Sequence, residues 1–169
     1  MPSTYTLIKG ETLASSAASY TFTAIPSTFT DLVLRVSARR SAAGRVDLDF
    51  YFNADNANNS YTYIRGNGAT ATSNRGGTII RNNDTVPSTS ETADTFGSAE
   101  IYVPNYVGTA LKPVSIFGVG ENNATTSYIT ATAGLWNFGA ATVTSITLSP
   151  SAGSFVTGSS FYLYGIKSS

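Results

Sequence analysis

The sequence contains no cysteine and no histidine, and it has few charged residues of either sign. Without cysteine the chain forms no disulfide and offers no thiol nucleophile or thiolate ligand. Without histidine it lacks the side chain most often used for acid-base catalysis near neutral pH, which is also a common zinc ligand. These absences exclude most familiar catalytic and metal-binding arrangements, and we expect neither an enzyme nor a metal or other cofactor.

Charged residues make up 12% of the 169 residues, about half of the usual share, and ten basic residues balance ten acidic ones. A formal net charge of zero provides no long-range attraction for nucleic acid or anionic lipid. The sequence has neither a long apolar segment nor an N-terminal charged region followed by an apolar run. We therefore expect no nucleic-acid partner, no membrane span and no signal peptide.

Apolar and polar residues alternate repeatedly along the chain, and the alternating stretches are separated by Gly, Asn, Pro and Ser. This period of two, rich in β-branched and aromatic residues, is typical of strands with one buried face. We predict a single all-β domain over residues 1–169, a two-sheet antiparallel β-sandwich that is jelly-roll-like and has roughly ten strands. The expected strands are 5–9, 19–24, 31–38, 45–52, 61–65, 78–81, 98–103, 112–119, 127–133, 142–148 and 161–167.

Some of these stretches predict more than a strand. The stretch 45–52 alternates most cleanly, and we predict that it pairs with 31–38 within one sheet. Residues 142–148 shift their apolar face midway, which predicts a β-bulge. The last stretch, 161–167, keeps apolar and aromatic residues close to the chain end, which predicts a final strand inserted into the core. Gly10 and Glu11 are expected to form a turn.

The middle of the chain, about 53–97, is richer in Gly, Asn, Ser and Thr, and its alternation is weaker. Long loops in a compact domain are usually functional or disordered. We therefore predict a loop-rich, insertion-like region here and expect any interaction surface to involve it.

All seven arginines fall in the first half of the chain. Arginine forms fork-shaped hydrogen bonds to carboxylates, and arginine and tyrosine are both enriched at protein interfaces. The hypothesis is an interface with a neighbouring subunit or a carboxylate-bearing surface, and the alternative is ordinary solvated charge. The candidate interface residues are Arg35, Arg39, Arg40, Arg45, Tyr51, Tyr61, Tyr63, Arg65, Arg75 and Arg81.

Three other groups each allow two interpretations. Asp47 and Asp49 have the composition of a catalytic carboxylate pair, but the nearby arginines favour cross-strand ion pairs. The segment 53–59 offers oxygen ligands for calcium but a single carboxylate, which favours an ordinary turn. Trp136 with Tyr128 would suit stacking on a sugar ring, whereas a tryptophan beside a strand is more often part of the core.

The segments 2–8, 20–22, 29–35, 96–106, 112–115 and 161–167, the last ending in Tyr-Leu-Tyr-Gly-Ile-Lys, carry a resemblance that spans nearly the whole chain. Together they resemble small virion proteins of tailed bacteriophages, including cyanophages and other aquatic phages. The resemblance rests on framework strands rather than on a site.

This resemblance implies a structural virion protein, made in the cytoplasm of the bacterial host, that acts as a capsid decoration (cement) protein and stabilises the shell. Its implied partners are the major capsid protein and further copies of itself in a homotrimer. The alternative is a receptor-binding or tail-associated module that recognises host surface glycans. A glycoside hydrolase or lyase fragment is disfavoured by the chain length and by the lack of a convincing carboxylate pair.

Overall fold

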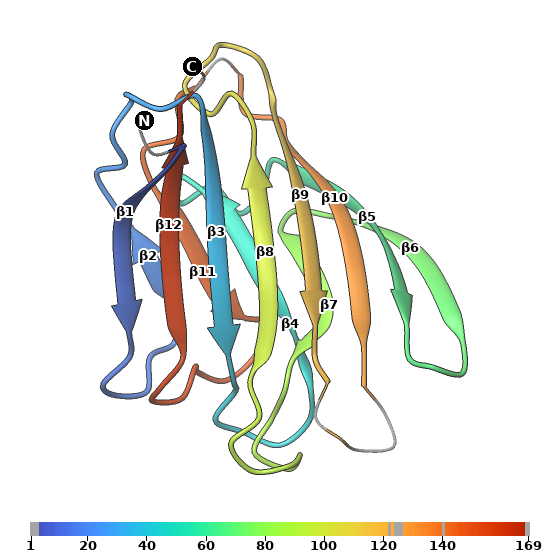
Figure 1. The fold of residues 1–169 in the computed structure, drawn as a ribbon. Helices are drawn as coiled ribbons and strands as arrows, with labels where there is room; N and C mark the ends of the chain where they lie inside the picture. The colour runs from blue at the N-terminus through green and yellow to red at the C-terminus, as the bar shows by residue number, and fades with distance from the viewer. Residues whose placement is uncertain (1–3, 122, 124–126, 140, 168–169) are drawn as a thin grey trace.

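The structure, a computed structural model, describes residues 4–121, 123, 127–139 and 141–167. It is an all-β sandwich of two antiparallel sheets, as predicted (Figure 1). The strands are β1 (Tyr5–Thr12), β2 (Tyr20–Phe22), β3 (Asp31–Ala38), β4 (Val46–Phe52), β5 (Asn59–Gly66), β6 (Ala71–Gly77), β7 (Ile80–Val86), β8 (Gly97–Val103), β9 (Lys112–Val119), β10 (Ile129–Trp136), β11 (Ile146–Pro150) and β12 (Ser160–Ile166). Over this part of the chain, no helix has the length and hydrophobicity needed to cross a membrane.

The two sheets differ in width. The larger has eight strands in the order β1-β12-β3-β8-β9-β10-β5-β6, and the smaller has four in the order β2-β11-β4-β7. Because the larger sheet is wider, its β5–β6 hairpin extends past the smaller sheet (Figure 1).

Side-chain alternation in the strands builds one core between the sheets. Full burial of one large aliphatic or aromatic side chain stabilises the fold by about 1.5–3 kcal/mol. Each strand therefore turns its apolar face toward the core. The fully buried residues include Leu32, Leu34, Leu48, Phe50, Phe52, Ile80, Ile101, Ile146, Leu148, Phe161 and Leu163.

The predicted insertion of the last strand is confirmed. β12 lies between β1 and β3, with Phe161 and Leu163 fully buried in the core. On the same face, the ring of Phe29 covers Gly165, where an ideal Cβ would lie 2.3 Å from the ring atom Cγ. A side chain at this position would displace Phe29, so the glycine is required for packing.

The predicted pairing of 31–38 with 45–52 is wrong. β3 lies between β12 and β8 in the larger sheet, whereas β4 lies between β11 and β7 in the smaller one. Their apolar faces therefore meet across the core instead of lying side by side. Alternation identifies which face of a strand is buried, but it is the same for neighbouring and for facing strands.

Most strand boundaries differ from the prediction by one or more residues, and three differences are instructive. β1 continues through Gly10 and Glu11, which form no turn, and its irregularity is a shift of register between Leu7 and Lys9. The residues before Ile146 lie outside β11, so the predicted bulge in 142–148 is absent and Val143 is buried from a loop. β10 extends to Trp136.

The middle region is more regular than predicted, because 59–66, 71–77 and 80–86 are strands. β6 lies at the margin of the larger sheet, and six of its seven residues are exposed. The exception is Gly76, against which the ring of Tyr61 packs. A strand so largely exposed needs no apolar side chains, so its sequence shows no strand-like alternation.

A buried lysine closes the loop before β9. Lys112 is almost inaccessible to solvent, and its ammonium group donates hydrogen bonds to the backbone carbonyls of Gly108 and Ala110. Burial lowers the pKa of Lys112. The side chain thus satisfies carbonyls that the loop between β8 and β9 leaves unpaired.

Candidate functional site

Arg39, a candidate interface residue, is a structural residue. Its side chain is buried, and one guanidinium nitrogen donates to the carbonyls of Thr92 and Thr95, both at 2.8 Å. A second nitrogen donates to the carbonyl of Glu91. Arg39 therefore anchors the loop after β7, and its placement at an interface was wrong, because the protein's own backbone uses its donors.

Arg45 has a similar internal role in the same region. Its guanidinium forms an ion pair with Glu91 and donates to the carbonyls of Asp84 and Gly120. The second carboxylate oxygen of Glu91 accepts the backbone N–H of Ser88 at 2.6 Å. Only 8% of the Arg45 side chain is exposed, so its assignment to an interface is also corrected.

Arg65 and Arg81 close the side of the sandwich along β7. Arg65 forms an ion pair with Asp84, and Arg81 forms one with Asp49 at 2.8 Å. From β10, the hydroxyl groups of two buried threonines donate to carbonyls of β7. We call this set the β7 seam: Asp49, Arg65, Arg81, Asp84, Thr130 and Thr132, with Thr130 bound to the carbonyl of Asn83 and Thr132 to that of Arg81.

The carboxylates near this seam have structural partners. Burial raises the pKa of Asp49 to about 6, because desolvation outweighs the hydrogen bond and the positive charge of Arg81. Burial also raises the pKa of Asp47, whose carboxylate accepts the backbone N–H of Asp84 at 3.0 Å. The cross-strand ion pair expected for this group is confirmed between Asp49 and Arg81.

Trp136 is part of the core, so its assignment to glycan stacking was wrong. It is 1% exposed, packs beside Phe52, and has Phe138 stacked at 5.8 Å between ring centroids. Its indole N–H donates to a carboxylate oxygen of Asp55 at 2.7 Å. Tyr128 is half-buried, and the guanidinium groups of Arg45 and Arg65 lie 5.4 and 5.1 Å from its ring centroid.

Asp55 organises the segment 53–59 as a turn. One of its oxygens accepts the backbone N–H groups of Ala57 and Asn58, at 3.0 and 3.1 Å. Desolvation acts to raise the pKa of Asp55, but hydrogen bonds from Trp136, Ala57 and Asn58 lower it to about 2. The described residues contain no group of three or more side chains with the composition of a metal site.

The remaining candidate interface residues are scattered. Tyr61 is buried and stacks on Tyr63, so it is not available on the surface. Arg35 is exposed and paired with Glu100 at 2.6 Å on the outer face of the larger sheet. The others are partly exposed or exposed but lie apart: Arg40 donates to the carbonyl of Gly44, Tyr51 lies on β4, and Arg75 lies on β6.

A different surface stands out on the outer face of the larger sheet, over β9, β10 and β5. Three large apolar residues are exposed there, Ile64 by 63%, Phe117 by 53% and Ile129 by 49%. They surround open hollows of about 430 and 240 Å³ that share Ala131 in their lining. We call this surface the outer groove, and we define it by Ile64, Phe117, Ile129, Ala131 and Ala133.

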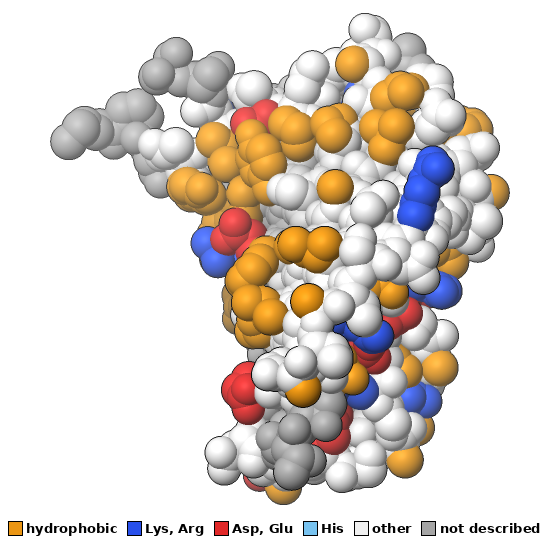
Figure 2. Space-filling model, turned by 90° about the vertical axis from the view of Figure 1, so that its right-hand side faces the viewer, with side chains coloured by type: hydrophobic (Ala, Val, Ile, Leu, Met, Phe, Trp, Pro, Cys, Tyr) orange, Lys and Arg blue, Asp and Glu red, His pale blue; other side chains and the backbone are white. Residues whose placement is uncertain are grey.

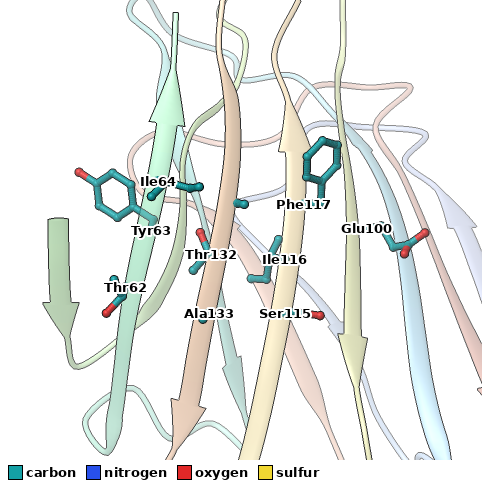
Figure 3. Close-up of a pocket in the computed structure, with 10 residues that line it drawn as sticks. Thr62, Tyr63, Ile64, Glu100, Ser115, Ile116, Phe117, Thr132 and Ala133 are labelled. Carbon is teal, nitrogen blue, oxygen red and sulfur yellow. The ribbon is translucent and has the colours of Figure 1, made fainter. Parts of the chain in front are cut away.

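The strand register explains the shape of the outer groove. Ala131 pairs with Ile64 of β5 on one side and with Phe117 of β9 on the other. Figure 3 shows Ile64 and Phe117 on the two sides of the strand that carries Thr132 and Ala133. Small alanines thus form the floor and larger side chains the walls. Figure 2, seen from the side of β6, shows hydrophobic side chains in several exposed groups.

β10 carries apolar residues on its outward face and two buried threonines on its inward one. Thr130 and Thr132 are buried between the sheets, whereas Ile129, Ala131 and Ala133 face outward. The threonines face inward because their hydroxyl groups donate to the β7 carbonyls of Asn83 and Arg81. In the sequence, the stretches 112–119 and 129–136 each have apolar residues on both faces. Their pattern therefore indicates a strand but does not identify which face is exposed.

Comparison of this chain with protein-family models, with curated proteins and with solved structures finds no match. Its function is therefore inferred from its own residues and their geometry.

Proposed function

We propose that this chain is a structural virion protein of a tailed bacteriophage that decorates the capsid shell and docks on it through the outer groove. The observation that carries the proposal is the outward apolar face of β10 with exposed Ile64, Phe117 and Ile129 around it. A contiguous exposed apolar surface of this kind is typical of a protein-protein contact.

The surroundings of the outer groove support a shell protein as the occupant. The Arg35–Glu100 pair beside it offers one charge of each sign, and the chain has no formal net charge. Contacts made by apolar and hydrogen-bonding groups depend weakly on salt, which suits a particle that meets different ionic strengths. The likeness of the framework strands to small phage virion proteins also favours this location.

The decisive experiment is a reconstruction of the intact particle. We expect many copies distributed over the shell, with β9, β10 and β5 facing the major capsid protein. A few copies confined to the tail would overturn the proposal and favour the tail-associated alternative. The burial of Trp136 removes the residue on which glycan stacking was based, and a glycan array on the purified protein tests that alternative directly.

Single substitutions test the docking surface. Phe117→Ser and Ile64→Ser are expected to reduce particle retention at least tenfold, because both side chains form walls of the outer groove. A matched control is Leu7→Ser, since Leu7 is 53% exposed on β1 and lies outside the groove. Exposed substitutions usually change stability by less than about 0.5 kcal/mol, so all three variants should fold. Equal retention of the three would contradict docking through the groove.

The homotrimer implied by the resemblance stays a prediction. Sedimentation equilibrium of the purified protein measures it, and a mass of three chains that persists on dilution is the expected result.

A further inference from the structure

β6 is a free edge of the eight-stranded sheet, and it is unusually regular. It pairs with β5 alone, in an unbroken register from Ser60 opposite Gly77 to Gly66 opposite Ala71. Figure 1 shows the strand at the margin of the sheet. The backbone N–H and C=O groups on its far side are therefore open to another strand, apart from the N–H of Arg75, which the side-chain oxygen of Asn74 accepts.

The turn before β6 keeps this edge in place. The side-chain oxygen of Asn67 accepts the backbone N–H groups of Ala69 and Thr70, at 3.1 and 2.8 Å. Gly68 adopts a φ of 86°, which few other residues tolerate. The edge is thus preorganised by its hairpin, and pairing with another strand requires little ordering of the chain.

The other sheet edges that the structure describes are protected. The pairing of β1 is interrupted by a register shift between Leu7 and Lys9, and the charged side chain of Lys9 lies on this strand. β2 has three residues, which is too short for extensive pairing. The carbonyls of β7 are bound by the threonines of the β7 seam. Natural edge strands are commonly protected by bulges, charged side chains, short length or covering groups. Of these, β6 has only the charge of Arg75 and the side-chain oxygen of Asn74, which accepts the backbone N–H of Arg75 at 2.7 Å.

We propose that β6 pairs antiparallel with β6 of a second copy of this chain, about a two-fold axis at Asn74. This register uses all seven residues of the strand. It places Asn74 opposite Asn74 of the second copy, Ser73 opposite Arg75, Thr72 opposite Gly76, and Ala71 opposite Gly77.

The side chains of β6 favour this partner. Arg75, the single charged residue of the strand, meets the hydroxyl group of Ser73 and not another arginine. The side-chain oxygen of Asn74 accepts the N–H of Arg75 within its own strand, and its amide N–H groups can donate to the second copy across the axis. A formal net charge of zero places no long-range repulsion between two copies.

This contact leaves the outer groove free. Pairing through β6 joins the two larger sheets side by side, so that both outer grooves lie on the same face of one continuous sheet. The two copies of β10 are then five strand spacings apart, about 24 Å. The two-fold contact does not depend on the virion location, and it is compatible with a threefold contact made by another surface.

The contact is small, because pairing of one edge strand buries less than the roughly 1,000 Å² of a stable interface. We therefore expect a dimer that dissociates on dilution and that forms readily where many copies are held close together. Disulfide cross-linking can capture a contact of this kind.

Single cysteines allow this cross-linking, since the natural chain has none. Asn74→Cys is expected to form a disulfide-linked dimer at least tenfold faster than Thr6→Cys, a control on the exposed edge strand β1. Ser73→Cys mixed with Arg75→Cys should cross-link in the mixture far faster than either variant alone, which tests the register. Equal rates for Asn74→Cys and the control would overturn the proposal.

A charge at the axis gives a second measurement. Asn74→Lys places two ammonium groups opposite each other and is expected to remove the two-fold association that sedimentation detects in the concentrated natural protein. The position is exposed, so far-ultraviolet circular dichroism should show an unchanged fold. Dimerisation of Asn74→Lys at the level of the natural protein would show that β6 is not the contact.

Discussion

Gly118 of β9 contacts Asn82 of β7 where the two sheets face each other. This contact can be perturbed by a substitution at either residue. An ideal Cβ on Gly118 would lie 1.9 Å from Oδ1 of Asn82 and 3.0 Å from its Cγ, so Gly118→Ala must displace the asparagine. Asn82 is fully buried, and its Nδ2 donates to the carbonyl of Thr130 and the hydroxyl of Thr132, both at 3.2 Å.

The expected magnitudes follow from these contacts. Overpacking costs about 1–3 kcal/mol, and weakening two buried hydrogen bonds costs about 1 kcal/mol each, so Gly118→Ala should lower the free energy of unfolding by about 3–5 kcal/mol. Asn82→Ala should lower it by about 2–3 kcal/mol, because it removes both hydrogen bonds and leaves a cavity. In the double variant the new methyl group occupies that cavity, and the loss should be smaller than the sum by about 1–2 kcal/mol.

Urea unfolding of the four proteins measures this double-mutant cycle. A loss of 3 kcal/mol moves the midpoint by about 1.5 M when the slope is about 2 kcal/mol per molar urea. Gly66→Ala is a matched control in the same sheet, since its Cβ would meet Ile129 at an ordinary 3.7 Å. Additivity of the two core substitutions within about 0.5 kcal/mol would refute the contact as described.

Two predictions concern the buried and hydrogen-bonded carboxylates. The folded protein binds a proton at Asp49 up to a pKa of about 6, which lies above the ordinary value of 3.8, so the free energy of unfolding should fall as pH rises from about 4 to about 6. Denaturation at a series of pH values should show this fall in the natural protein and a weaker one in Asp49→Asn; identical profiles would contradict it. For Asp55, whose pKa is lowered to about 2, the stabilisation is present above pH 4 and is lost as pH falls through 2. Trp136→Phe removes one donor and should raise this pKa toward 3.8 in a carboxyl NMR titration, and an unchanged value would argue against the indole hydrogen bond.

Strands with one buried face could be predicted from the sequence. The predicted ranges 31–38 and 112–119 match β3 and β9, because in both strands apolar residues recur on the face that packs in the core. β6 could not be found in this way, since its pairing with β5 requires no apolar side chain. The pairing of β3 and β4 was mispredicted because period-two alternation carries no information on the neighbour.

The candidate site was harder to predict for a related reason. The arginines were predicted to form an interface or to be solvated, but Arg39 binds Thr92 and Thr95, which are more than 50 residues away in the sequence. Whether an arginine meets its own chain or another molecule depends on such long-range contacts. The outer groove was missed because the threonines of β10 face inward, against the usual distribution of polar residues.

Lys112 has a practical consequence for attaching labels to this protein. The chain has three lysines, and the ammonium group of Lys112 is buried on carbonyl oxygens, whereas Lys9 and Lys167 are exposed. Amine-reactive dyes and immobilisation reagents should therefore modify Lys9 on β1 and Lys167 just after β12 but spare Lys112. These two strands are neighbours at the margin opposite β6. A protein coupled to a sensor surface through these lysines would present β6 and the outer groove to the solution.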